Sequence, residues 1–342
     1  MNLLEFARHM PKAELHVHLE GSILPTTLLK LAQRNGIVLP AQNETGLQEF
    51  YHFRDFSHFI QVYMTIIGCL RTPDDYHLIA YEFGSSCARQ NIRYAEVTFT
   101  IETNARFSGL AWPVILEALN AGRAQATAEF GVDWRWVFDI VRDLPTTQDE
   151  VADVALAARQ QGVVALGLGG SEAGFPPELF EKAFRRARQA GLARVPHAGE
   201  TAGPGSIWGA LDRLSADRIG HGVRCIEDPR LVETLSERQI PLEICPTSNI
   251  CLGVYPDYAS HPLRRLWEAG LLITVNSDDP PMFGTDLNHE YEMLVKHFAF
   301  NATELERISL NAVQSSLLPD SEKHRLETAF RQEFARLRTE LG

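Results

Sequence analysis

Apolar residues recur along the chain in eight short strand-like runs, most of them followed by a stretch of helical periodicity. The strand-like runs lie at residues 13–20, 92–100, 133–141, 163–170, 193–200, 217–223, 240–249 and 271–279. The helical stretches lie at residues 22–34, 113–130, 147–161, 177–190, 205–214, 229–238 and 261–269. Strands that alternate with helices are typical of parallel pairing with right-handed crossovers. Eight such units predict an α/β fold, the (β/α)8 TIM barrel.

An open, doubly wound sheet is the alternative arrangement of alternating strands and helices. Such a sheet usually carries a Gly-rich phosphate-binding loop after its first strand, and none follows residues 13–20. The Gly-Leu-Gly-Gly run at 167–170 also lacks the GxGxxG spacing of a dinucleotide site. The barrel is therefore the favoured fold.

Two segments lie outside this alternation. Residues 36–89 are a long, aromatic-rich excursion, which we expect to form extra helices inserted after the first strand as a lid over one end of the barrel. Residues 287–342 are helical and charged, and we expect a C-terminal helical extension over the outside of the barrel. Because no linker, repeat or low-complexity tract interrupts the chain, we expect residues 1–342 to form a single domain.

Charge and composition limit the partners. The 342 residues include 32 Lys+Arg against 44 Asp+Glu, and the net charge of −12 disfavours binding to the phosphate backbone of nucleic acids. A small neutral or cationic substrate is expected instead. No stretch approaches the roughly 20 apolar residues of a membrane span, and the amino terminus lacks the apolar run of a signal peptide. We therefore expect no nucleic-acid or membrane partner and a cytoplasmic location, while the oligomeric state stays open.

The five cysteines are expected to be reduced thiols, because their number is odd and no CxxC pair occurs. They are Cys69, Cys87, Cys225, Cys245 and Cys251. Cys245 and Cys251 are a candidate metal pair, but their spacing matches no common zinc motif. Burial as small apolar residues is the favoured interpretation.

Candidate chemistry begins in the first strand-like run, which carries His16 and His18. Residues two apart in a strand point to the same face, so these two imidazoles are expected to lie side by side, where a divalent metal can bridge them. Two histidines make an incomplete site, because a catalytic zinc usually takes three protein ligands and a water. The other ligands must come from elsewhere in the chain.

Polar residues also end three later strand-like runs, at the edge where barrel enzymes carry their active sites. They are His197 and Glu200, His221, and the pair Asp278 and Asp279. Each alone has a structural explanation, since a single histidine is more often a hydrogen-bonded core residue and two aspartates before a proline often cap a helix. Their occurrence at corresponding strand ends favours one site. Glu200 follows His197 by three residues, which lets it reach over a metal without binding it.

The ligand set favours zinc. Three imidazoles, from His16, His18 and His197, and the carboxylate of Asp278 suit Zn²⁺ better than Mg²⁺ or Ca²⁺, which prefer oxygen ligands. Iron and manganese remain alternatives. A water at a further position would become a nucleophile, because the ion lowers the pKa of that water toward neutrality. A second metal needs a bridging ligand, commonly a carboxylated lysine after the fourth strand, and the chain ends that strand in glycines, so we expect one zinc per subunit.

Five ordered motifs make the sequence resemble the adenosine deaminase family, the adenosine and adenine branch of the metal-dependent amidohydrolases. The motifs are Glu14-Leu-His-Val-His-Leu-Glu-Gly, His197-Ala-Gly-Glu, Arg218-Ile-Gly-His-Gly, Cys245-Pro-Thr-Ser-Asn and Asn276-Ser-Asp-Asp-Pro. The resemblance covers nearly the whole chain. The other zinc deaminase design, with a Cys/His ligand set and a P-C-x-x-C motif, is absent from the sequence.

This resemblance implies hydrolytic deamination at carbon 6 of a 6-aminopurine, with release of ammonia. The implied zinc ligands are His16, His18, His197 and Asp278. Glu200, kept protonated by a raised pKa, is implied to give its proton to ring nitrogen N1. His221 is implied to orient the nucleophile and to stabilise the developing charge.

The resemblance also implies where the substrate is held. The implied substrate contacts are His18, Glu20, Gly170 and Asp279. Asp279 would bond N7 of the base, and the backbone N–H of Gly170 would meet N3. Adenosine-specific members usually carry Asp where this chain has Glu20, and that carboxylate contacts the ribose 5′-hydroxyl.

The sequence predicts the substrate less precisely than the reaction. The adenine branch tends to carry Asp before the catalytic histidine, where this chain has Gly220, and we expect this small residue to keep the ribose side open. Residues 279–286, which include Met282, look more like the aminodeoxyfutalosine branch and unassigned bacterial adenosine deaminases than like the adenine branch. We expect adenosine or deoxyadenosine, converted to inosine or deoxyinosine, with 6-aminodeoxyfutalosine of menaquinone biosynthesis and then adenine as alternatives. An amide or lactone hydrolase on the same barrel is a different class, which would leave Glu200 and Asp279 without a use.

Overall fold

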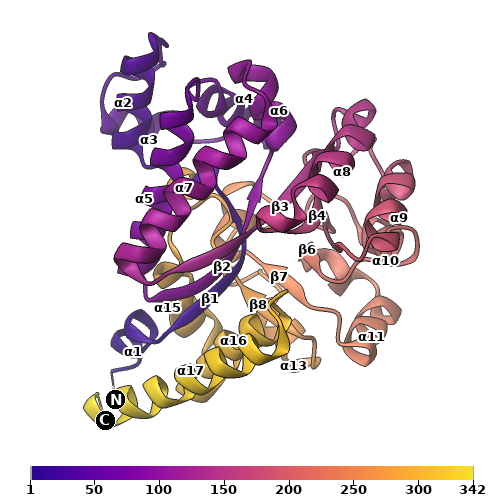
Figure 1. The fold of residues 1–342 in the computed structure, drawn as a ribbon. Helices are drawn as coiled ribbons and strands as arrows, with labels where there is room; N and C mark the ends of the chain where they lie inside the picture. Colours follow the sequence, from indigo (N-terminus) through magenta and orange to yellow (C-terminus); the bar gives the residue numbers. More distant parts are fainter. Residues whose placement is uncertain (1, 342) are drawn as a thin grey trace.

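The computed structural model describes residues 2–341 and contains, within them, one eight-stranded sheet in which every neighbouring pair is parallel, in the order β1 to β8 (Figure 1). The strands are β1 (Lys12–His18), β2 (Ile92–Phe99), β3 (Asp133–Val141), β4 (Val163–Gly169), β5 (Ala193–Ala198), β6 (Ile219–His221), β7 (Leu242–Ile244) and β8 (Ile273–Val275). A parallel bridge between Val17 and Asp278 joins the segment after β8 back to β1. The sheet therefore closes, which confirms the predicted (β/α)8 barrel.

The helices alternate with the strands and surround them. They are α1 (Leu3–His9), α2 (Pro25–Asn35), α3 (Glu44–Phe50), α4 (Phe56–Ile67), α5 (Pro73–Arg89), α6 (Ile101–Ser108), α7 (Trp112–Phe130), α8 (Gln148–Ala157), α9 (Glu181–Gln189), α10 (Pro204–Asp212), α11 (Pro229–Arg238), α12 (Pro246–Cys251), α13 (Leu263–Glu268), α14 (Pro280–Phe283), α15 (Leu287–Phe298), α16 (Ala302–Ser315) and α17 (Asp320–Glu340). Short 3₁₀ turns are η1 (Glu20–Ser22), η2 (Pro145–Thr147), η3 (Arg159–Gln161), η4 (Pro177–Phe180) and η5 (Val223–Glu227). Among the described residues, no helix has both the length and the hydrophobicity to cross a membrane.

Local signals explain where these helices begin and end. Seven of the described α-helices carry a proline at their first or second position, as α5 and α7 do, where the missing N–H would have had no helical partner. The helix α7 ends at Gly131, which adopts φ of 72°, a left-handed conformation that favours glycine. The helices α5 and α7 pack closely because Gly122 lacks a side chain, and a Cβ there would lie 2.3 Å from the carbonyl oxygen of His77.

The inserted segment and the tail are helical as expected. Within residues 36–89, α3 and α4 are the extra helices, whereas α5 is the crossover helix that leads into β2. In the tail, α16 packs against β1 and β8 and so serves as the last helix of the barrel, with α17 outside it (Figure 1). The amino-terminal helix α1, which the periodicity did not predict, packs against α15 and α16.

The later strands β6 to β8 are shorter than predicted at both ends, and β7 and β8 lose most at their carboxyl ends. The run at 240–249 yields only Leu242–Ile244, because Pro246 cannot donate to the sheet and instead begins α12. The first strand likewise stops at His18, and Glu20 begins the turn η1. These irregular strand ends carry the candidate functional residues.

Candidate metal centre

The carboxyl ends of β1, β5 and β8 bring four predicted ligands together inside the barrel mouth. His18 Nε2 lies 3.3 Å from His197 Nε2. Asp278 Oδ1 lies 3.4 Å from Nε2 of both His16 and His18. All four side chains are buried. His221 joins the same cluster, since one nitrogen or oxygen from each of His16, His197, His221 and Asp278 lies within 4.8 Å of the others.

The donor set and its unused bonding capacity fit a zinc ion. Within the described chain, His16 Nε2, which lies 3.4 Å from Asp278 Oδ1, is buried and has no hydrogen-bond partner. An unpaired buried nitrogen is unfavourable unless another group binds it. Although burial lowers the pKa of His16, the neighbouring carboxylates of Asp278 and Glu243 raise it to about 10, so these acids favour a cation at this position. Imidazoles with one carboxylate are ligands that zinc accepts.

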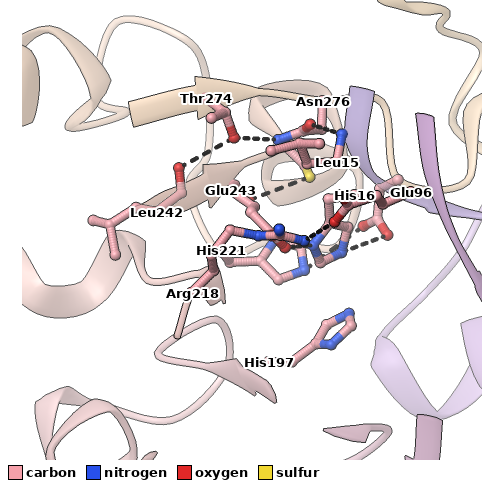
Figure 2. A network of polar contacts seen from close by, with 12 residues as sticks. Leu15, His16, Glu96, His197, Arg218, His221, Leu242, Glu243, Thr274 and Asn276 are labelled. Carbon is pink, nitrogen blue, oxygen red and sulfur yellow. Dashed lines mark hydrogen bonds and ion pairs between the residues drawn. The ribbon is translucent and has the colours of Figure 1, made fainter. Parts of the chain in front are cut away.

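A buried polar network holds His16 in place (Figure 2). Glu243 Oε2 lies 3.0 Å from His16 Nδ1, and Glu243 Oε1 accepts from Arg218 Nε at 2.5 Å. Arg218 Nη2 pairs in turn with Glu96 at 2.6 Å. Because a carboxylate accepts only, it fixes the N–H of His16 on Nδ1 and leaves the Nε2 lone pair directed at the cluster. Sequence reasoning missed Glu243 and Glu96, whose partners come from distant strands.

The backbone at the site is strained at two functional positions. His221 has φ of 59° and Asp278 has φ of 65°, which are left-handed values uncommon for residues other than glycine. The neighbouring glycine relieves crowding rather than opening a substrate pocket. A Cβ at Gly220 would lie 2.9 Å from His16 Cε1, so the small residue makes room for the histidine. This corrects the expectation that Gly220 keeps the ribose side open.

Glu200 lies at the end of β5 in a loop organised by another acid, Glu172. Burial, together with repulsion from Asp278 and Glu172, raises the pKa of Glu200 well above its usual value, as a proton donor at neutral pH requires. Glu172 accepts from the backbone N–H groups of four consecutive residues, 199–202, at 2.8 to 3.1 Å. It also accepts from the Ser206 hydroxyl. Sequence reasoning gave Glu172 no role.

The cluster opens into a cavity of about 350 Å³. Gly170, Asp279 and Glu200 line it together with His18 and His221. Asp279 is buried, and burial plus repulsion from Asp278 raises its pKa well above the usual value, so this carboxyl can donate a hydrogen bond. The fit is tight, since a Cβ at position 21 would lie 1.7 Å from Asp279 Oδ1, and Gly21 has none.

Glu20 is placed differently from the expectation. Its side chain is fully buried and does not line the cavity. Its oxygens accept from the Thr100 N–H at 3.0 Å, the Asn104 amide at 2.6 Å and the Tyr63 hydroxyl at 3.2 Å. Because these donors already surround the carboxyl group, Glu20 holds the cavity wall from behind.

The wall opposite the cluster is apolar and belongs mainly to α4. It presents Phe56, Phe59, Ile60, Tyr63, Met64 and Ile67. Arg106 of α6 is the one arginine or lysine among the described residues that line this cavity, and it is exposed. Met282 faces a larger, separate cavity of about 720 Å³ on the other side of α14, which contains none of the cluster residues.

Comparisons with known proteins agree with this geometry. A model of the adenosine deaminase family matches residues 11–332. Aminodeoxyfutalosine deaminase of Streptomyces avermitilis is 42% identical over 329 residues, which cover 95% of this chain and 91% of that protein. Adenine deaminase of Bordetella avium is 38% identical and covers 90% of this chain and 97% of its own. An amidohydrolase of Burkholderia ambifaria, solved with bound zinc, superposes with a TM-score of 0.91 at 30% identity, covering 99% of this chain and 94% of its own.

Proposed function

Because the chain belongs to the adenosine deaminase family of hydrolytic C–N deaminases, we propose that it replaces the 6-amino group of a purine nucleoside with oxygen and releases ammonia. The observation that carries the proposal is the juxtaposition of Glu200 and the histidine cluster in one cavity. His221 Nε2 lies 3.8 Å from both Glu200 Oε2 and Asp278 Oδ2, so acid and ligand flank the same point. An amide or lactone hydrolase would have no use for the protonated Glu200.

One zinc would be held by the four residues whose donor atoms converge. They are His16, His18, His197 and Asp278. Zinc, when bound at such a site, activates water for attack at neutral pH. Although burial opposes ionisation, the hydrogen bond with His16 and the neighbouring histidines hold the pKa of Asp278 well below its usual value. The Ser248 hydroxyl, which donates to Asp278 Oδ2 at 2.6 Å, orients the carboxylate.

The chain's own groups would then orient and protonate the purine. Glu200 gives its proton to ring nitrogen N1, which makes carbon 6 more electrophilic. Asp279 donates from its protonated carboxyl to N7, and the Gly170 N–H meets N3. His221 donates from Nε2 to the oxygen that attacks, which offsets the charge that develops there.

Among nucleosides, the apolar wall favours one with more than a plain ribose. The six apolar and aromatic side chains of α4 would leave a sugar hydroxyl without a hydrogen-bond partner. Arg106 offers a cation at the mouth of the cavity. A nucleoside with an apolar substituent ending in an anion fits both. Aminodeoxyfutalosine, named for the Streptomyces relative, is therefore our first candidate. Adenosine and deoxyadenosine follow, and adenine would leave the wall uncovered.

The test is the change in ultraviolet absorbance when a 6-aminopurine becomes a 6-oxopurine. Zinc-loaded protein is given aminodeoxyfutalosine, adenosine, deoxyadenosine or adenine at equal concentration, and kcat/KM is compared. We expect the largest value for aminodeoxyfutalosine. A larger value for adenosine would overturn the substrate assignment, and no change with any of the four would overturn the deaminase proposal itself.

Removing the cation at the mouth tests the substrate assignment separately. We expect Arg106→Ala to lower the kcat/KM ratio of aminodeoxyfutalosine to adenosine about tenfold, because the guanidinium contacts only the substrate with an anion. Arg185→Ala, at an exposed position of α9, is the matched control and should leave the ratio unchanged. An unchanged ratio in Arg106→Ala would show that the anion lies elsewhere.

A further inference from the structure

A chain of hydrogen bonds leads from the start of α13 to His221. The backbone N–H of Leu263 donates to His261 Nδ1 at 3.2 Å. His261 Nε2 lies 3.0 Å from Asn249 Oδ1. Asn249 Nδ2 lies 3.2 Å from His221 Nδ1. The three side chains are at most 5% exposed, and Asn249 ends the motif Cys245-Pro-Thr-Ser-Asn, which the chemistry above uses only through Ser248.

Each of these three hydrogen bonds can have only one donor–acceptor direction. A backbone N–H can donate but never accept, so His261 Nδ1 is an acceptor. Burial lowers the pKa of His261 to about 3, and the neutral ring carries its single N–H on Nε2. That N–H donates to Asn249 Oδ1, which turns the Asn249 amide nitrogen toward His221. The amide donates to His221 Nδ1, and the remaining proton of His221 stays on Nε2.

We propose that His261 and Asn249 are positioning residues that set the tautomer of His221, so that its Nε2–H always faces the reacting oxygen. The direction originates in the backbone of α13, which no change of pH or substrate reverses. With the other tautomer, Nε2 would present a lone pair toward Glu200 and Asp278, both 3.8 Å away, and toward an incoming oxygen.

The packing around His261 holds this hydrogen-bond relay, which runs from the Leu263 N–H to His221 Nδ1, in one geometry. The His261 ring lies with its centroid 5.0 Å from that of Tyr255 and 5.7 Å from that of Phe298, both in edge-on contact. Asn249 is held at the C-terminal part of α12, where its own N–H bonds the Cys245 carbonyl. Neither side chain can turn without breaking these contacts, so the tautomer is selected by the fold before substrate arrives.

The tautomer is read directly by nitrogen NMR. Zinc-loaded protein labelled with ¹⁵N-histidine gives distinct ring shifts for Nδ1–H and Nε2–H forms, and His221→Gln identifies the His221 signals by their loss. We expect the Nε2–H form in the parent protein without substrate. The Nδ1–H form, or a mixture, would overturn the proposal. This measurement does not use the proposed deaminase activity, so its failure is distinguishable from failure of that function.

Asn249→Asp reverses the relay by changing one polar group. The new carboxylate accepts, so a neutral His221 must donate from Nδ1 and carries no N–H on Nε2. We expect the NMR signals to switch form, kcat to fall about 100-fold or more, KM to change less than about threefold and bound zinc to stay stoichiometric. The rate effect rests on the proposed function, whereas the switch of form does not. Retention of the Nε2–H form would overturn the proposal.

Because Asn249→Asp buries a new charge, a second pair of variants tests the relay without adding one. His261→Gln keeps a donor for Asn249 and should keep the parent tautomer and kcat within about threefold, whereas His261→Phe removes the donor and should give mixed tautomers and about a tenfold lower kcat. His324→Gln, at an exposed position, is the control for the substitution itself. Equal behaviour of His261→Gln and His261→Phe would overturn the proposal.

Discussion

At the scale of single residues, His197 contributes an imidazole to a cluster in which no donor is redundant. We expect His197→Ala to lose stoichiometric zinc, with affinity lowered at least about 100-fold, because the substitution removes one of the four proposed ligands. Elemental analysis after dialysis measures the bound metal. His324→Ala is the control at an exposed position. Stoichiometric zinc in His197→Ala would contradict the ligand assignment.

Glu200 is expected to act on the substrate and not on the metal. Glu200→Gln removes the transferable proton but keeps the shape of the side chain, so we expect zinc to remain and kcat to fall about 10²- to 10⁴-fold. Glu237→Gln, at an exposed position of α11, makes the same chemical change away from the site. Turnover near that of the parent protein would remove Glu200 from its role as acid.

Sequence reasoning brought His16, His18, His197 and Asp278 to one place because each ends a strand, and strand ends converge in a barrel. It could not identify Glu243, whose contact with His16 joins residues 227 positions apart. The resemblance implied a substrate contact for Glu20, and the alternation extended the first strand as far as this residue. The chain turns into η1 instead, which directs the carboxyl group into the wall.

At the scale of elements, the loop after β5 depends on one buried carboxylate. Burial opposes ionisation, but the Ser206 hydroxyl, the charge of Arg142 and the loop N–H groups lower the pKa of Glu172 below its usual value. We expect Glu172→Gln to speed amide exchange across residues 199–202 and to lower kcat about tenfold or more, with zinc retained. Hydrogen-exchange mass spectrometry and steady-state kinetics measure the two effects.

Glu178→Gln is the matched control for this prediction, because Glu178 is exposed and lies on the neighbouring turn η4. It should leave both exchange and turnover as in the parent protein. Slower turnover in Glu172→Gln without faster exchange at 199–202 would mean that Glu172 acts through its charge on Glu200 and not through the loop.

Elements with long periodic segments were predictable, and short ones were not. The helix at 229–238 coincides with α11, because Pro229 begins it and its apolar face is regular. The strands β6, β7 and β8 hold three residues each, too few for alternation to mark their ends. The helix α12 overlaps the end of the strand predicted at 240–249, and within it Ser248 and Asn249 contact Asp278 and His221.

At the scale of the whole molecule, buried acids make stability depend on pH. Glu290 is fully buried, and burial raises its pKa to about 7 against hydrogen bonds from Thr247 and Thr285. Its folded pKa lies above the unfolded one, so the folded state binds more protons between about pH 4.5 and 7. Protonated Glu290 therefore favours the folded state relative to ionised Glu290. This contribution to the free energy of unfolding is fully present below about pH 4.5 and is lost as the pH rises through 7.

Glu290→Gln removes this dependence. We expect the variant to match the parent protein near pH 5 and to exceed its free energy of unfolding by on the order of 3 kcal/mol near pH 8. Urea denaturation at the two pH values, with both proteins equally loaded with zinc, measures the difference. The same difference at both values would show that Glu290 does not titrate on folding.

The whole architecture followed from counting alternating units, because eight strand–helix pairs have one favoured closed arrangement. The length of the segment at residues 36–89 predicted that it forms helices, but not which of these helices belongs to the barrel. Periodicity cannot tell the barrel helix α5 from the extra helices α3 and α4, since all three bury one face. The amino-terminal helix α1 is too short for its periodicity to stand out, and its apolar face becomes visible only against α15 and α16.

The parallel bridge between Val17 and Asp278 joins two points of the chain that leave the ribosome far apart in time. His16 and His18 emerge at the start of synthesis and Asp278 near its end, with His197 between them. A nascent chain that holds only the two early histidines has too few ligands for tight zinc binding. Under the proposed ligand assignment, the complete set of four ligands exists only after the last strand has been made and the barrel has closed.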